Sequence, residues 1–282
     1  NGDAITYIWE EMDVQNNKST APSATKTSGP AFRSYSPTTS PIRYFPKMSS
    51  VLAGSTTTAG DAINVEVLPS VTRTLKFRLT VRDNKTNGAA NAYDDMTVSV
   101  NSTYGPFNIT SQNNTGISYP QGSSQTVTCN VASTSTLSAN VDILLSTDGG
   151  NTWTTLLAGT PNDGTQSVTF PNILSTTGRF MVKASSSIFF NVNTKDFAIS
   201  APDTTPPTAP TLSASGTTSV STVLAFTGAT DNVAVTAYEI YKDGALLTTV
   251  TASPFTVTGL TPSTTYNFVV KAKDGSGNVS ID

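Results

Sequence analysis

The sequence predicts an all-β protein, and three observations support this prediction. Hydrophobic residues make up 37 % of the 282 residues, and they fall in short alternating runs rich in Val, Ile, Thr, Tyr and Phe, which is typical of strands. No window of about 12 residues shows the 3.6-residue apolar period of an amphipathic helix. Gly, Pro, Asn and Asp separate the runs, as turn residues do between strands.

Two changes of composition divide the chain. The first lies at residues 102–106, and the second is the Pro-rich segment 201–207. The three resulting segments, 1–103, 104–200 and 201–282, each have the size of an immunoglobulin-like sandwich. We therefore expect three consecutive immunoglobulin-like β-sandwich domains.

The third segment contains the clearest strands. Runs at 222–226, 237–241 and 246–250 alternate, and Asp243-Gly244 between the last two favours a tight hairpin turn with positive φ. The run from Tyr266 onward alternates as well. These runs predict short strands joined by tight turns.

Four phrases of this segment resemble the fibronectin type III domain of bacterial extracellular proteins. They are ATDNV at 229–233, YEIYKDG at 238–244, GLTPSTTY at 259–266 and AKDGSGNVS at 272–280. The resemblance implies that Tyr266 forms the tyrosine corner of the domain and that Phe226 replaces a core Trp. It also implies a last strand after Ser280, so we expect residues 201–282 to be a fibronectin type III domain lacking that strand.

The first segment combines strands with a long insertion. Residues 2–10, GDAITYIWE, resemble a strand of PKD-like and cadherin-like domains, which implies that one or two preceding strands are missing. Runs at 74–83 and 94–100 predict a half-buried antiparallel hairpin. A polar insertion covers residues 14–61, and a connection of this length is usually functional or ordered by its own contacts.

The middle segment is predicted to be a second sandwich, because apolar residues alternate at 127–131 and at 141–145 and recur in runs at 153–157, 180–184 and 196–199. Together with the first segment, it resembles the region that follows the catalytic domain in secreted reprolysin-type zinc metallopeptidases of flavobacteria. The phrases are YIWEEMD at 7–13, FRSY at 32–35, SPIRYFP at 40–46, NVDILLSTDGG at 140–150 and GTPNDG at 159–164. This resemblance implies an upstream catalytic domain as partner and export through the type IX pathway.

Histidine is absent, which excludes Ser-His-Asp and Cys-His catalysis and imidazole metal ligands within this stretch. The net charge of −3 gives no electrostatic support to nucleic-acid binding. No apolar run approaches the roughly 18 residues of a membrane span. A single cysteine fits both a reducing cytosol and a bacterial secreted protein, and the Thr/Ser/Asn-rich, Lys-poor composition favours a secreted or cell-surface location.

One motif is specific. Ser146, Asp148, Gly150, Thr152 and Trp153 match the Asp-box pattern S-x-D-x-G-x-T-W. In sialidase-like propellers this pattern forms a structural hairpin, in which the Asp caps the turn amides. A single copy without propeller repeats predicts a structural turn and gives no information about glycosidase activity.

Carboxylates occur in two further groups. Asp83, Asp94 and Asp95 flank one predicted hairpin and are candidate Ca²⁺ ligands, although no EF-hand-like spacing supports them. Glu10 and Glu11 precede Asp13, but neighbouring residues of a strand face opposite sides, so they are poor catalytic partners. For this second group we expect a solvated strand end.

Three further features, namely Cys129, the aromatic and basic side chains of the insertion, and Thr204, each allow two interpretations. Cys129 alternates with Val residues, which predicts an inert buried thiol rather than a reactive one. The insertion residues Arg33, Tyr35, Arg43, Tyr44 and Phe45 suit either a sugar- or protein-contact surface or ordinary packing.

Thr204 lies in an Asp203-Thr204-Thr205 sequence that matches the O-glycosylation pattern of exported Bacteroidetes proteins. The same three residues match by chance in a fraction of unrelated sequences, so glycosylation is one of two alternatives.

The sequence thus predicts a non-catalytic, extracellular sandwich array that acts as a spacer or docking region of a larger secreted protein. No catalytic or cofactor-binding residue is predicted. The alternatives are a cell-surface adhesin or carbohydrate-binding module, whose partner is an extracellular protein or glycan, and a hydrolase that uses carboxylates such as Glu10.

Overall fold

The computed structural model describes residues 4–14, 21–86 and 88–282. The chain divides into two compact units, residues 1–200 and residues 201–282. Strands dominate both units, and the α-helix and 3₁₀ turn among the described residues are α1 (Met48–Leu52) and η1 (Thr134–Thr136). The all-β prediction is confirmed, whereas the predicted division of the first unit near residue 103 stays a prediction.

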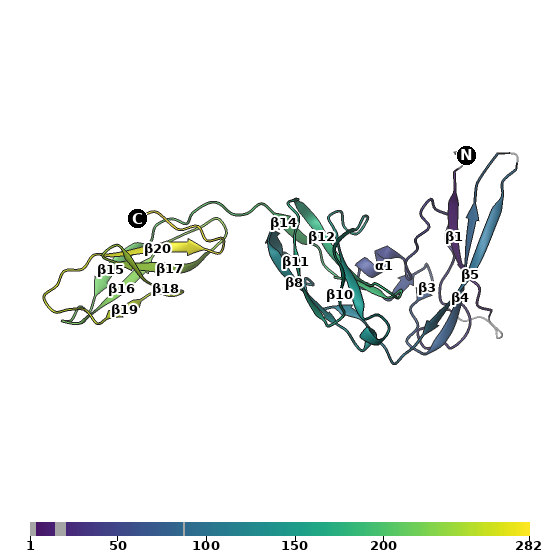
Figure 1. Ribbon diagram of the computed structural model, residues 1–282, viewed down its shortest axis with the longest axis horizontal. Helices are drawn as coiled ribbons and strands as arrows, with labels where there is room; N and C mark the ends of the chain where they lie inside the picture. Colours follow the sequence, from purple (N-terminus) through teal and green to yellow (C-terminus); the bar gives the residue numbers. More distant parts are fainter. Residues whose placement is uncertain (1–3, 15–20, 87) are drawn as a thin grey trace. The chain divides into compact units, whose positions relative to one another are not determined.

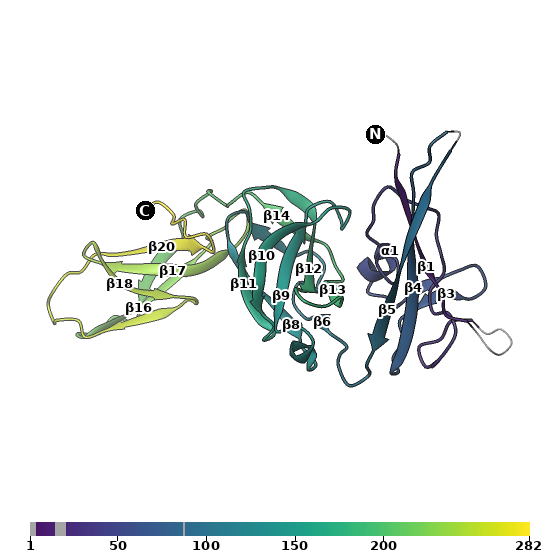
Figure 2. The ribbon, with the colours of Figure 1, turned by 45° about the vertical axis from the view of Figure 1, so that its right-hand side comes forward.

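The first part of unit 1–200 is a single antiparallel sheet with a separate small hairpin. Strands β1 (Thr6–Glu11), β4 (Arg73–Arg82) and β5 (Asn91–Val100) pair in the order β1-β4-β5. Strands β2 (Thr57–Ala59) and β3 (Asn64–Val67) pair with each other. Figure 2 shows the long β4–β5 hairpin. Gly2 and Asp3 of the predicted first strand phrase lie outside the described residues.

The core of this first part is small. Leu75 and Phe77 of β4 are buried together with Ala31 and Phe32, which come from the insertion. The predicted alternation of β4 therefore places its apolar side chains inward, and the insertion supplies the surface that covers them.

The middle part of the same unit is a two-sheet sandwich. One sheet has the order β10-β9-β12-β14-β7 with β13 beside β12, and the other has the order β11-β8-β6. The strands are β6 (Asn108–Ile109), β7 (Ser118–Pro120), β8 (Ser124–Asn130), β9 (Asn140–Ser146), β10 (Thr154–Pro161), β11 (Thr165–Thr169), β12 (Ser175–Ala184), β13 (Phe190–Val192) and β14 (Phe197–Ser200). Between the sheets lies a core that includes Phe170, Phe180 and Phe197.

The insertion joins these two parts of unit 1–200. Its apolar side chains pack on the outer face of the β9–β12–β13 sheet, and α1 contacts β13. Figure 1 shows α1 between the middle sandwich and the first sheet. We call this contact the insertion joint: Tyr44, Met48, Val51 and Leu52 against Leu144, Trp153, Met181, Phe190 and Val192. Because this sheet face is apolar, it needs a cover, which explains why residues 1–200 form one compact unit instead of two.

Unit 201–282 is a sandwich of two three-stranded sheets, ordered β15-β16-β19 and β18-β17-β20. The strands are β15 (Thr211–Ser215), β16 (Ser221–Thr227), β17 (Val235–Lys242), β18 (Ala245–Val250), β19 (Phe255–Thr258) and β20 (Phe268–Asp274). Asp243 and Gly244 both have positive φ, 51° and 82°, as the predicted hairpin turn requires. After β20, Val279 folds back to form a bridge with Lys273.

No helix among the described residues combines the length and the apolar character that crossing a bilayer requires.

Candidate functional site

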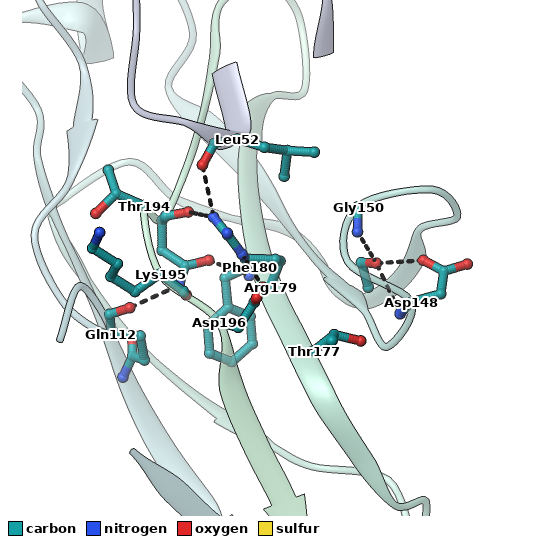
Figure 3. Close-up of polar contacts among 12 residues, drawn as sticks. Leu52, Gln112, Asp148, Gly150, Thr177, Arg179, Phe180, Thr194, Lys195 and Asp196 are labelled. Atoms are coloured by element: carbon teal, nitrogen blue, oxygen red, sulfur yellow. Dashed lines mark hydrogen bonds and ion pairs between the residues drawn. The ribbon is translucent and has the colours of Figure 1, made fainter. Parts of the chain in front are cut away.

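The turn between β9 and β10 carries the predicted Asp-box residues. Asp148 accepts hydrogen bonds from the hydroxyl and backbone N–H of Thr152 at 2.6 and 2.9 Å and from the N–H of Asn151 at 3.0 Å. The Ser146 hydroxyl donates to Asp148 at 2.7 Å and accepts from the N–H of Gly150 at 2.8 Å (Figure 3). These bonds, those from Thr152 foremost, lower the pKa of Asp148 to about 2. The carboxylate is therefore occupied by its own turn.

The same turn contacts the insertion joint. A Cβ at Gly150, whose φ is +94°, would lie 2.6 Å from a methyl carbon of Leu52. Arg179 on β12 donates to the carbonyl oxygen of Leu52 at 3.0 Å and pairs with Asp196 at 2.5 Å (Figure 3). The Asp-box turn thus belongs to a structural joint between helix α1 and the sandwich.

Asn193 organises the loop beneath this joint. Its side chain is fully buried and donates to the carbonyl oxygens of Gln112 and Lys195 at 2.7 and 2.6 Å, while its oxygen accepts from the N–H of Phe180 at 2.7 Å. Sequence reasoning missed Asn193, because an Asn after a short strand carries no periodic signal.

A buried ion pair holds the insertion against the first sheet. Glu66 on β3 is fully buried and accepts hydrogen bonds from Arg43 at 2.8 Å, from the N–H of Lys47 at 2.9 Å and from the hydroxyl of Thr58 at 2.7 Å. Arg43 also donates to the carbonyl oxygen of Trp9 at 2.6 Å. The sequence analysis did not single out Glu66 as a functional or structural residue.

Of the insertion side chains predicted as a contact surface, Arg33 is exposed and the other four are half-buried. The Arg43 guanidinium lies over the rings of Tyr35 and Phe45, 4.9 and 4.4 Å from their centroids, and Tyr44 packs edge-on against Phe190 at 5.2 Å. Beside them is a hollow of about 200 Å³, smaller than the roughly 300 Å³ at which ligand pockets begin. Of the two alternatives left open, the structure favours packing.

Two carboxylates at the end of β1, those of Glu11 and Asp13, are half-buried and accept backbone hydrogen bonds. Glu11 accepts hydrogen bonds from the N–H groups of Ala31 and Phe32 at 2.7 and 2.6 Å, and Asp13 accepts from the N–H of Lys76 at 3.0 Å. Burial of Glu11 raises its pKa to about 7. The expectation of a solvated strand end is wrong for Glu11, because the insertion crosses over it.

Cys129 is half-buried, and burial raises the pKa of its thiol to about 12. A thiol with this pKa is protonated at neutral pH and is therefore a poor nucleophile. This agrees with the prediction of an inert rather than a reactive thiol.

The three candidate Ca²⁺ ligands near β4 and β5 are engaged separately. Asp95 pairs with Arg78 at 2.7 Å, Asp83 accepts from the N–H of Ala90 at 2.8 Å, and Asp94 accepts from the N–H of Asp95 at 2.9 Å. The structure does not bring Asp83, Asp94 and Asp95 into one group.

Two predicted residues lie in unit 201–282. The Tyr266 hydroxyl accepts a hydrogen bond from the N–H of Thr261 at 2.9 Å, which is the type of contact that a tyrosine corner makes. Thr204 is exposed in the 201–207 segment, where a glycan would have room.

A group of carboxylates that sequence reasoning did not assemble lies in the same unit. Asp203 precedes β15, Asp231 lies between β16 and β17, and Asp274 ends β20. One oxygen from each lies within 4.8 Å of the others. Among the described residues, these three form the one group of Asp, Glu or Cys side chains that lie close enough together to hold a metal ion. Only the fold of the sandwich brings these three loops together.

Comparison with known proteins identifies the second unit. The sequence profile of the fibronectin type III domain matches residues 205–281, so the chain contains a fibronectin type III domain. The chain is 52 % identical over 79 residues to chitinase A1 of Niallia circulans, and 50 % identical over 80 residues to chitinase Chi52 of Paenibacillus xylanexedens. It is 53 % identical over 79 residues to exoglucanase A of Cellulomonas fimi.

These matches cover 28 % of this chain and from 9 to 15 % of each relative. They concern fibronectin type III regions of chitinases and exoglucanases, and none of these relatives is a metallopeptidase. Among solved structures, the fibronectin(III)-like modules of CbhA from Clostridium thermocellum match with a TM-score of 0.35 and 14 % identity, covering 62 % of this chain and 89 % of that one.

Proposed function

We propose that this chain is a non-catalytic spacer and docking region of a larger secreted protein. The observation that carries the proposal is the insertion joint, in which side chains of the insertion pack on the middle sandwich within the compact unit 1–200. The side chains most suited to chemistry, Asp148, Arg43 and Glu66, are all engaged in structural contacts.

The fibronectin type III relatives support this role, because each match spans only a small part of a much longer enzyme. A module that recurs beside several kinds of catalytic domain serves them in a way that does not depend on their substrate. The proposal includes secretion from a bacterium, and it leaves Thr204 as a candidate O-glycosylation site.

Disrupting the joint tests the proposal. The variant Leu52→Asp places a carboxylate in the apolar contact with Trp153 and Gly150, so we expect residues 1–200 to lose compactness. Small-angle scattering should show a larger radius of gyration, and limited proteolysis should cut near residues 101–106. The matched control Leu174→Asp changes a side chain that is already 63 % exposed and should leave both measurements unchanged. Equal behaviour of the two variants would contradict the spacer proposal.

A more specific proposal concerns the catalytic domain of the larger protein to which this chain belongs. The phrases of residues 1–200 support a zinc metallopeptidase, whereas the relatives of residues 205–281 are chitinases and exoglucanases. Sequencing the whole parent gene decides between them: an upstream helix with H-E-x-x-H supports the metallopeptidase, and a glycosidase domain in its place contradicts it.

The carbohydrate-binding alternative rests on the hollow lined by aromatic side chains such as Tyr7, Trp9 and Tyr35. A glycan array probed with the wild-type chain and with Tyr35→Ala tests it. Binding that the variant loses would support this alternative, and the absence of any binding would leave the spacer role as the better account.

A further inference from the structure

The carboxylates of Asp203, Asp231 and Asp274 form a concentrated negative charge. Asp274 is almost fully buried, at 3 % exposure, and the other two are half-buried. The ion pairs of the described residues involve other carboxylates, so no lysine or arginine of that part of the chain neutralises the three. Like charges at this separation repel strongly where water is excluded.

One oxygen of each of these carboxylates accepts hydrogen bonds from backbone N–H groups. One oxygen of Asp203 accepts from the N–H of Thr205 at 3.0 Å, and one oxygen of Asp231 accepts from the N–H groups of Val233 and Ala234, both at 2.9 Å. Asp274 accepts from the N–H of Asn278 at 2.8 Å. The carboxylates are therefore held in place before any ligand binds.

The remaining oxygens of Asp203 and Asp231 are an independent sign of a ligand. Asp203 Oδ2 and Asp231 Oδ1 are both buried, and neither has a hydrogen-bond partner among the described residues. A buried carboxylate oxygen without a donor is unfavourable and rare in folded proteins. Two such atoms in one cluster of three negative charges indicate that a cation completes it.

The chemistry of the donors indicates the kind of cation, because all three are carboxylate oxygens. Ca²⁺ binds oxygen ligands at about 2.3–2.6 Å, so oxygens on opposite sides of one ion are about 4.6–5.2 Å apart. The three oxygens lie within 4.8 Å of one another, which is close enough for one ion of this size to contact all of them. Mg²⁺, at about 2.0–2.1 Å, needs a tighter cage, and an all-oxygen donor set is a poor match to Zn²⁺.

We propose that Asp203, Asp231 and Asp274 bind a calcium ion, which fastens the 201–207 segment to the fibronectin type III domain. Asn278 prepares this arrangement, since its amide donates to the carbonyl oxygen of Asp203 at 3.0 Å and to Asp274 at 2.7 Å. The ion links the segment that leads into the domain with the β16–β17 loop and with the end of β20. The stability of the domain and of its entry segment thereby depends on the calcium concentration.

Calorimetry on the whole 282-residue chain tests the proposal. After dialysis against EDTA, titration with CaCl₂ should show one site per chain with a Kd on the order of 10⁻⁴–10⁻³ M, as in extracellular modules. In thermal scans, 10 mM CaCl₂ should raise the unfolding midpoint of one transition by about 5 °C or more, and 10 mM MgCl₂ should raise it less.

Two isosteric variants locate the site. Asp203→Asn and Asp231→Asn should each abolish the binding heat and the calcium-induced shift. In EDTA their midpoints should equal or exceed that of the wild type, because each removes one of three repelling charges. Asp243→Asn is the matched control, since Asp243 belongs to the same unit and accepts from the N–H of Asn267 at 2.8 Å, and it should bind Ca²⁺ like the wild type.

The proposal is overturned if the wild type shows neither heat nor a shift with CaCl₂, or if Asp203→Asn and Asp231→Asn keep the wild-type shift. A shift with MgCl₂ equal to that with CaCl₂ overturns the assignment to calcium. Midpoints of both variants below the wild type in EDTA would show that the carboxylates hold the loops without an ion.

Discussion

The first part of unit 1–200 and the middle sandwich belong to one compact unit, but their interiors are built in different ways. In the middle sandwich, the rings of Phe170, Phe180 and Phe197 meet at centroid distances of 4.9 to 5.6 Å. In the first part, the apolar core is small, and a fully buried Glu66 paired with Arg43 stands next to it.

The difference follows from the number of sheets. Two sheets that face each other bury their inner faces, so alternating apolar residues are sufficient for a core. The single sheet of the first part has no second sheet opposite it among the described residues, and the irregular insertion covers it. Irregular backbone brings N–H and C=O groups inside, and these need polar partners, which Glu66, Arg43 and Glu11 provide.

The largest effect should come from the aromatic core. Phe180→Ala removes a fully buried ring and should lower the free energy of unfolding by about 3–5 kcal/mol. Urea denaturation followed by the fluorescence of Trp153, in a chain where Trp9 is replaced by Phe, measures it. Leu174→Ala, at a mostly exposed position, is the control and should change the value by less than about 0.5 kcal/mol.

The buried ion pair of the first part should come next. Glu66→Gln leaves the Arg43 charge without its partner and should cost about 2–3 kcal/mol. The fluorescence of Trp9, in a chain where Trp153 is replaced by Phe, reports on this part. Asp95→Asn breaks the exposed pair with Arg78 and should have little effect. If the two substitutions cost the same, the polar network does not hold the first part together.

The third prediction concerns pH and Glu11. Burial raises the pKa of Glu11 from 4.5 to about 7, so the unfolded chain ionises first as the pH rises. The free energy of unfolding should therefore fall between about pH 4.5 and pH 7 and then level off. In Glu11→Gln this contribution should vanish in denaturation series across that range. Glu10→Gln, one residue earlier on the same strand, should keep the wild-type slope.

The smallest effect should come from the Asp-box turn, where the pH dependence has the opposite sign. Hydrogen bonds, foremost from Thr152, lower the pKa of Asp148 from 3.8 to about 2, so the stability they give is present above about pH 4 and is lost toward pH 2. Asp148→Asn should be less stable than the wild type at pH 7, and the difference should shrink as the pH falls through about 2, as measured by Trp153 fluorescence. A difference that is as large at pH 2 as at pH 7 would contradict this account.

Local features were predictable because they depend on neighbours in the sequence. The alternation of β4, the positive φ of Asp243 and Gly244, and the spacing from Ser146 to Trp153 are all set within a few residues. The short helix α1 was not expected, since five residues carry no readable helical period. Its position is decided by the contact of Leu52 with Gly150 and Arg179.

By itself, the sequence determined the all-β class, the boundary before the fibronectin type III domain and the absence of histidine chemistry. Only the tertiary structure decided which distant residues meet: Glu66 with Arg43, α1 with the middle sandwich, and Asp203 with Asp231 and Asp274. The physical reason is that strand alternation and turn chemistry are local, whereas an ion pair or a cation site forms where separate loops converge. In the sequence, Asp83, Asp94 and Asp95 flank one predicted hairpin and were the candidate calcium ligands, whereas the fold gathers a different set of carboxylates.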